Sequence, residues 1–274
     1  MANSNTLPVK IGLLYDFPQM GTMLKDTLQL GLDEVAATGR LDRDIEFVER
    51  ASRGLPAGSE AEVTRAFADL VDRDVLVIVG PSISDNGLIV APLCDAARVP
   101  AINYTGGERT RSEWMFHYQV GSLEEEPPVL AQRMVARGLR RAAVIFDQSP
   151  VGRRYAEYFE AARGRLGLEV TGTASISALT EDATEPIERL RQADPDVLVY
   201  LGLGVSSRAV ALALAATGWD VPVLANSALM FGYARPDWRS RPIGLVASSV
   251  SAEMLAVPVT SRPRRARADS KYSA

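Results

Sequence analysis

The sequence predicts an α/β protein built from two doubly wound parallel sheets, and two observations lead to this fold class. Short apolar segments rich in β-branched residues alternate along the chain with longer segments whose apolar residues recur at helical spacing. The alternation restarts after residue 126, so the chain holds two successive runs of βα units. Such units form parallel sheets with right-handed crossovers. We therefore expect a first lobe at 1–120, a second lobe at 121–250, and a hinge remnant with a disordered basic tail at 251–274.

The first run contains four expected strands and three expected helices. The third strand is an unbroken apolar stretch, VLVIV at 75–79, as expected for a strand buried on both faces. The second helix has Ser59 at its N-cap position and Glu62 three residues later, which is typical of a capping box. We expect strands at 9–15, 44–50, 75–79 and 101–104, and helices at 21–38, 59–71 and 85–98.

The second run has five expected strands and four expected helices. Residues 116–126 precede it and are predicted to form a crossover between the lobes. Pro127 and Pro128 suit the first turn of a helix, where a missing N–H costs nothing. We expect helices at 127–136, 152–166, 185–192 and 206–217, and strands at 142–146, 168–176, 197–201, 221–225 and 245–249.

Composition excludes several classes of function. A net charge of -4 argues against a nucleic-acid-binding surface. One cysteine and one histidine can form neither an intrachain disulfide nor the usual nitrogen and sulfur ligand set of a metal site. No window approaches the roughly 20 apolar residues of a membrane span, and residues 1–8 lack the features of a secretory signal. As written the chain is expected to stay in the cytoplasm, or to be periplasmic or otherwise extracytoplasmic if a leader lies upstream.

The sequence offers little for catalysis or for a cofactor. Neither GxSxG nor GxxxxGK[ST] occurs, and the GLG turn at 202–204 lacks the third glycine of a dinucleotide loop because Ser207 stands there. The only histidine, His117, lies among aromatic residues, which favours a packed or inter-domain side chain over a catalytic one. We predict that the chain is not an enzyme and uses no cofactor. A hydrolase-like enzyme of doubly wound fold is the alternative, and substrate turnover would reveal it.

Small and polar residues follow the expected strands, above all in the GPSIS turn at 80–84. Ligands of open α/β sheets bind past the carboxyl ends of the strands. Hydroxyl, amide and backbone N–H groups between apolar walls suit a small polar ligand. The candidate ligand-binding residues are Phe17, Ser82, Ser84, Thr105, Gly106 and Gly107 in the first lobe, and Val151, Leu203, Gly204, Asn226 and Ser227 in the second.

The order of these pieces resembles the type I periplasmic binding protein fold, and within it the Leu/Ile/Val-binding family of ABC transporter receptors. The resemblance covers residues 9 to about 255. It is carried by the order and spacing of KIGLL at 10–14, the helix end at 31–41, VGPSIS at 79–84, VPAIN at 99–103, AVIFD at 143–147, ADPDV at 193–197 and GWDVPVL at 218–224.

The resemblance implies two lobes, joined by hinge strands, that close on a ligand. It implies that an amino-acid carboxylate is held by the serine loop, at Ser84 with Ser82 nearby, and by groups at Thr105 to Gly107. Family members are about a hundred residues longer, so lobe one is expected to lack its final strand and helices and to leave apolar surface uncovered or facing a partner.

The second lobe departs from the amino-acid-binding pattern of the family. Val151 stands where those proteins carry an aromatic residue before Gly152, and Asn226-Ser227 replace the acidic residue that receives the ligand ammonium. Burying an ammonium without a carboxylate is costly. We expect a solute-binding protein for a small polar molecule of amino acid, amide or carboxylate type, with an amide or carboxylic acid favoured over a free amino acid. Its partner is expected to be an ABC permease, or a regulatory protein if the chain is a cytoplasmic ligand sensor.

Overall fold

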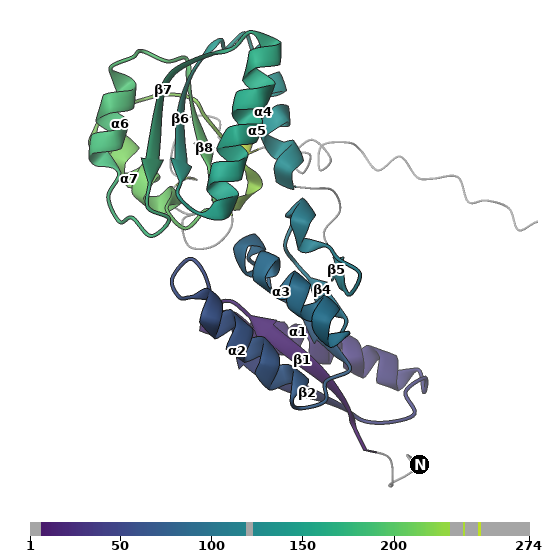
Figure 1. The fold of residues 1–274 in the computed structure, drawn as a ribbon. Helices are drawn as coiled ribbons and strands as arrows, with labels where there is room; N and C mark the ends of the chain where they lie inside the picture. The colour runs from purple at the N-terminus through teal and green to yellow at the C-terminus, as the bar shows by residue number, and fades with distance from the viewer. Residues whose placement is uncertain (1–6, 119–122, 231–237, 239–245, 248–274) are drawn as a thin grey trace, which may run out of the picture.

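The computed structural model describes residues 7–118, 123–230, 238 and 246–247, and it contains two α/β lobes (Figure 1). Each lobe has a five-stranded sheet in which every neighbouring pair is parallel, with strand orders β2-β1-β3-β4-β5 and β10-β9-β8-β6-β7. The predicted fold class is confirmed. The tail predicted at 251–274 lies outside the described residues.

Lobe one follows the predicted order with one addition. The short strand β5 was not expected, because residues 116 and 117 were assigned to the crossover. It pairs with β4 at the edge of the sheet. Three residues are too few to show a strand periodicity, so only the pairing reveals it. The elements are β1 (Val9–Tyr15), α1 (Pro18–Ala37), β2 (Ile45–Ala51), α2 (Glu60–Val71), β3 (Val77–Val79), α3 (Ser84–Ala97), β4 (Ala101–Asn103), η1 (Glu108–Thr110) and β5 (Met115–His117).

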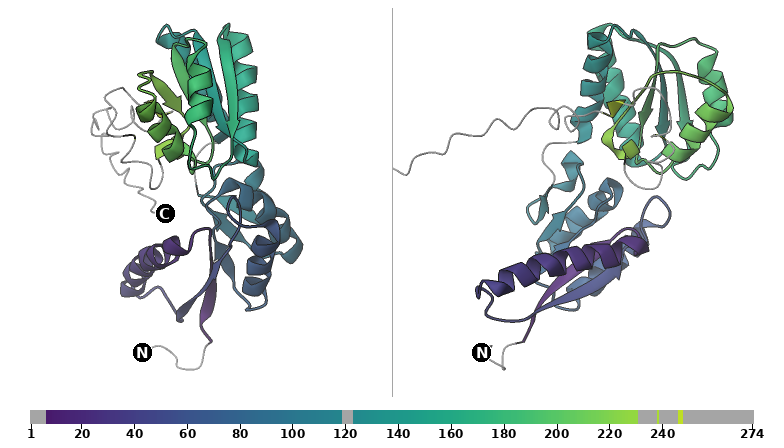
Figure 2. Two further views of the ribbon diagram at one scale, coloured as in Figure 1. Left: turned by 90° about the vertical axis from the view of Figure 1, so that its left-hand side faces the viewer. Right: turned by 180° about the vertical axis from the view of Figure 1, so that it is seen from behind.

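The two faces of the lobe-one sheet are covered unequally. On one face, Leu14 and Ile78 pack with Phe67 and Leu70 of α2 in a closed core. The opposite face is covered by α1, which Figure 2 shows across the sheet from α2 and α3. Beyond α1, Ile102 is 40% exposed and its register partner Phe116 is 52% exposed. This face is therefore incompletely covered by the described residues.

Lobe two has a core on each face of its sheet. Tyr155 and Phe159 of α5 pack with α4 over one face, and α6 and α7 cover the other. The elements are η2 (Leu123–Glu125), α4 (Glu126–Ala136), β6 (Arg141–Asp147), α5 (Pro150–Leu166), β7 (Glu169–Ile176), α6 (Thr184–Arg191), β8 (Val197–Leu201), α7 (Ser207–Ala216), β9 (Val223–Ala225), η3 (Ser227–Met230) and β10 (Val246–Ala247).

The carboxyl ends of both sheets point to the junction of the lobes. In Figure 1 the arrowheads of β6 and β7 point toward lobe one, and that of β1 points toward lobe two. The loops that follow the strands therefore meet between the lobes, where parallel sheets bind ligands. Within the described residues, no helix combines the length and the apolar character that crossing a bilayer requires.

Candidate functional site

A buried aspartate at the end of β1 shapes the serine loop of lobe one. The Asp16 carboxylate accepts hydrogen bonds from the Ser82 N–H at 2.6 Å, the Ser82 hydroxyl at 2.7 Å and the Ile83 N–H at 2.7 Å. It also accepts from the Asn86 amide at 2.7 Å and the Ser52 hydroxyl at 3.2 Å. Because the Ser82 hydroxyl is committed to Asp16, it fixes the loop in this structure.

Asp147, at the end of β6, is the counterpart of Asp16 in lobe two. It accepts from the N–H and hydroxyl of Ser149 and, at 2.7 Å, from the Leu203 N–H in the loop after β8. Burial raises the pKa of Asp147 from its usual value. A Cβ at Gly202 would lie 2.2 Å from the Asp147 carboxylate, so only glycine fits there. Neither aspartate was assigned a site role from the sequence, although Asp16 follows β1 and Asp147 ends β6, each shortly before a proline-started helix.

Ser84 and the loop after β4 contact each other and carry hydrogen-bond donors that have no partner among the described residues. Ser84 begins α3, is 5% exposed, and its hydroxyl has no hydrogen-bond partner among the described residues. A Cβ at Gly107 would lie 3.3 Å from the Ser84 hydroxyl oxygen, so the two loops touch. The N–H groups of Gly106 and Gly107 also have no partner in the described part of the chain. Three donors are thus brought together.

Thr105 is committed to an internal network. Its N–H and hydroxyl both donate to Asn103 Oδ1, at 3.0 Å and 2.7 Å. His117 Nε2 lies 2.5 Å from the Thr110 hydroxyl and 3.5 Å from that of Thr105. Burial lowers the pKa of His117. The histidine therefore packs against the loop that follows β4.

The predicted residues of lobe two mainly shape their loops. The Asn226 side chain accepts from the Gly202 N–H at 3.0 Å and donates to the Gly202 carbonyl at 2.8 Å. The Ser227 N–H donates to Glu126 Oε2 at 3.1 Å. Gly204 adopts a φ of +86°, which favours glycine. Leu203 is half-buried, so it has apolar surface for a contact.

Two carboxylates to which the sequence assigned no site role connect the lobes. Asp85, in the first turn of α3, accepts through Oδ1 a hydrogen bond from the Val151 N–H in the first turn of α5, at 3.1 Å. Glu124 accepts from the Glu108 N–H of lobe one at 2.9 Å and pairs with Arg154 of α5 at 2.8 Å. The N-terminal part of α5 is therefore contacted by two carboxylates, Asp85 from lobe one and Glu124 from the start of lobe two, and Glu124 also bonds to lobe one.

Asp85 is the most unusual titratable group at this junction. It is 2% exposed, and burial raises its pKa to about 7, against the lowering effect of the Val151 hydrogen bond and of Arg154. Its second oxygen, Oδ2, has no hydrogen-bond partner among the described residues. A buried polar atom without a partner is costly, so Oδ2 can accept a hydrogen bond from a group outside the described residues.

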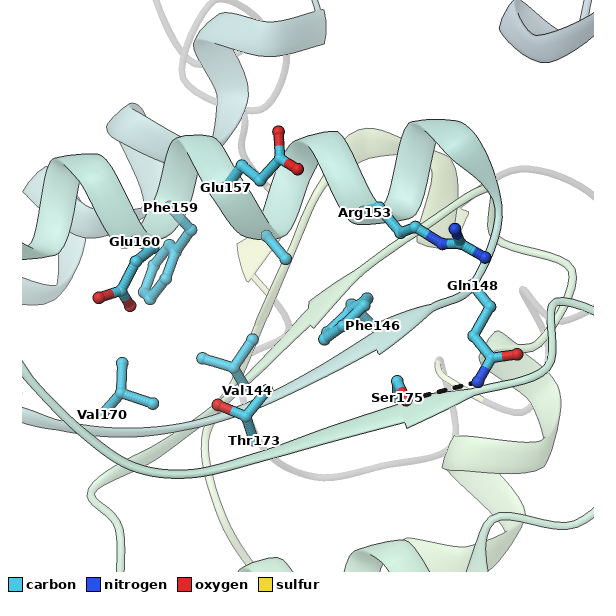
Figure 3. Close-up of a pocket in the computed structure, with 11 residues that line it drawn as sticks. Val144, Phe146, Gln148, Arg153, Glu157, Phe159, Glu160, Val170, Thr173 and Ser175 are labelled. Atoms are coloured by element: carbon cyan, nitrogen blue, oxygen red, sulfur yellow. Dashed lines mark hydrogen bonds between the residues drawn. The ribbon is translucent and has the colours of Figure 1, made fainter.

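A pocket of about 600 Å³ lies within lobe two, between α5 and the strands β6 and β7 (Figure 3). Phe146 and Phe159 line it, together with Arg153 and a Gln148–Ser175 hydrogen bond of 3.4 Å. None of the sequence-predicted site residues lines this pocket. Gln148 belongs to the loop after β6, so the pocket reaches one strand-end loop, while the predicted site residues lie elsewhere.

The described residues contain no group of three or more acidic, histidine or cysteine side chains placed to hold a metal ion. Cys94 is fully buried in the core of lobe one, and burial raises its pKa to about 12. A protonated, inaccessible thiol is a poor nucleophile.

Comparison with known proteins identifies a family. The model of the family described as "Periplasmic binding protein" matches residues 8–234. No curated protein matches the chain.

Solved structures show the same fold at low sequence identity. A solute-binding protein of an ABC transporter from Rhodopseudomonas palustris BisB5, in complex with 3,4-dihydroxybenzoic acid, is 19% identical over 83% of this chain, with a TM-score of 0.70. The leucine-binding protein LivK of Thermotoga maritima is 18% identical over 80%, with a TM-score of 0.69. The isoleucine complex of LivJ from Streptococcus pneumoniae is 18% identical over 81%, with a TM-score of 0.71. The match covers 66%, 63% and 65% of those chains, so this chain spans about two thirds of their length.

Proposed function

Because the chain belongs to the periplasmic binding protein family, we propose that it binds a small polar molecule reversibly between its two lobes. One observation carries this proposal. The unpaired donors of Ser84, Gly106 and Gly107 lie at the carboxyl ends of the lobe-one strands, close to the junction with α5. Convergent polar groups between apolar walls are typical of small-ligand sites. The family and the solute-binding neighbours point away from catalysis.

We infer that the physiological setting is uptake through an ABC permease outside the cytoplasm, as for receptors of the Leu/Ile/Val-binding type. The neighbours whose ligands are named bind isoleucine, 4-hydroxybenzoate or 3,4-dihydroxybenzoic acid. All three carry a carboxylate, so they support the amino acid and carboxylate types, and the amide type rests on Asn226-Ser227 in the sequence alone.

The contacts we propose divide the candidate residues by role. Ser84, Gly106 and Gly107 donate hydrogen bonds to the ligand. Phe17 and Leu203, which are partly exposed, provide apolar walls, whereas the Val151 side chain packs in the core of lobe two. The committed side chains of Ser82, Thr105 and Asn226 hold the loops in place, together with Gly204 and Ser227.

Thermal unfolding in the presence of ligands tests the proposal. The panel is leucine, leucinamide, benzoate, 4-hydroxybenzoate, benzamide and benzamidine. A compound present at a hundred times its dissociation constant stabilises the protein by about 2.7 kcal/mol. Ser84→Ala should weaken binding of that compound about fivefold, since a hydrogen bond contributes about 1 kcal/mol.

Ser175→Ala is the matched control, because it removes a hydroxyl from the pocket of Figure 3. It should leave affinity unchanged. Absence of stabilisation by every compound would contradict the proposed function, and loss of binding in Ser175→Ala alone would place the ligand in the pocket of lobe two.

A further inference from the structure

Asp85 places a carboxylate where the two lobes meet. Its side chain projects from the first turn of α3, directly after Ser84, and its Oδ1 accepts the Val151 N–H from the first turn of α5. Two helix N-termini thus face one carboxylate, since α3 carries it and α5 donates to it. Helix N-termini attract anions, and here the Asp85 carboxylate itself occupies the place that an anion would take.

The second oxygen of Asp85 is left for another group. Oδ2 is buried and has no hydrogen-bond partner in the described part of the chain, and Asp85 as a whole is only 2% exposed. The neighbouring Ser84 hydroxyl also has no partner among the described residues. An acceptor and a donor therefore lie on consecutive residues of one helical turn, next to the opposite lobe.

The charges around Asp85 do not favour a second anion. Among the described residues, Asp147 and Arg154 are the charged groups that act on Asp85, and Asp147 has the same sign. Arg154 already pairs at 2.8 Å with Glu124, whose side chain is 8% exposed. Glu124, Glu126 and Asp147 act together on the nearby Tyr155. The acidic groups of this region outnumber the one guanidinium that acts on Asp85.

We propose that Asp85 sets the charge class of the ligand: its buried carboxylate accepts a hydrogen bond from a neutral or cationic donor, such as an amide, amidine or amine, and rejects a carboxylate. The proposal rests on the proposed function and narrows its ligand range. It also accounts for the absence of an acidic residue at Asn226-Ser227. Asp85 of lobe one would supply the carboxylate that accepts a hydrogen bond from the ligand. The raised pKa of Asp85, about 7, makes this selection depend on pH.

Three compounds with one ring and different charge test this inference, namely benzoate, benzamide and benzamidine. Affinities are measured by calorimetry on the full chain and on Asp85→Asn, which keeps an oxygen for the Val151 N–H but cannot ionise. Asp26→Asn, an exposed position on α1, is the matched control. The wild type should bind benzamide or benzamidine at least tenfold more tightly than benzoate. Asp85→Asn should reduce that ratio at least tenfold, and Asp26→Asn should leave it unchanged.

The pH dependence gives a second readout that a purely structural contact would not move. From pH 6 to pH 8 the wild type should gain affinity for benzamidine and lose affinity for benzoate, whereas Asp85→Asn should do neither. Equal or tighter binding of benzoate by the wild type, or an unchanged ratio in Asp85→Asn, would overturn the role of Asp85 and leave the binding function standing. Failure of all three compounds, and of leucine, leucinamide and 4-hydroxybenzoate, to bind any variant would overturn both.

Discussion

Replacing Asp85 by asparagine should change how the stability of the protein depends on pH. Burial raises the folded-state pKa of Asp85 from 3.8 to about 7, so the folded protein favours the protonated carboxyl. The stability that this proton contributes is fully present below the unfolded-state pKa and is lost as pH rises through about 7. Asp85→Asn has no such proton to lose.

The size of the effect follows from the shift. A pKa raised from 3.8 to about 7 corresponds to about 4 kcal/mol of stability, of which about 3 kcal/mol disappears between pH 5 and pH 8.5. Since asparagine retains an acceptor for the Val151 N–H, the variant should lose little at pH 5. We therefore expect Asp85→Asn to be more stable than the wild type at pH 8.5 by up to about 3 kcal/mol.

Urea denaturation followed by circular dichroism at pH 5 and pH 8.5 measures this difference directly. The exposed Asp26→Asn variant controls for the general effect of removing a negative charge. If the difference in unfolding free energy between Asp85→Asn and the wild type is the same at both pH values, the carboxyl does not titrate as argued and the reasoning fails.

Four further outcomes follow from buried contacts. Asp16→Ala should lower the free energy of unfolding by about 3 kcal/mol and abolish ligand-induced stabilisation, because it leaves loop donors unpaired; unchanged denaturation and ligand-shift curves would contradict this. Gly202→Ala should cost about 3 kcal/mol in denaturant titration, since its Cβ would lie 2.2 Å from a carboxylate oxygen; an unchanged midpoint would count against it. Glu124→Gln removes a buried charge that links the lobes and should cost about 2 kcal/mol, with a larger radius of gyration in X-ray scattering; an unaltered scattering curve would refute the link. Cys94, whose pKa is raised to about 12, should react with iodoacetamide at pH 8 only after denaturation; rapid labelling of the native protein would disprove its burial.

The periodicity of the chain was sufficient to predict most of its elements. The apolar run at 75–79 includes β3, and Ser59 caps α2 by accepting the Glu62 N–H as predicted. These features are local, since they depend on neighbours one to four residues apart. The three-residue β5 could not be predicted in this way, because its pairing with β4 defines it.

The loops were placed correctly as strand ends, but the chemistry within them was only partly predictable. Ser82 and Ser84 look alike in the sequence, yet the Ser82 hydroxyl donates to Asp16 and the Ser84 hydroxyl has no partner among the described residues. The difference arises from Asp16, which lies 66 residues before Ser82 and is brought beside it by the pairing of β1 and β3.

The sequence by itself determined that this protein consists of βα units, that they form two parallel sheets, and that polar loops follow the strands. Only the tertiary structure decided which polar groups hold those loops and which are left for a ligand. The physical reason is that hydrogen-bond satisfaction in a buried junction depends on partners distant in the chain. Asp85 shows this most clearly, because its acidic character is visible in the sequence but its burial against Val151 of the other lobe is not.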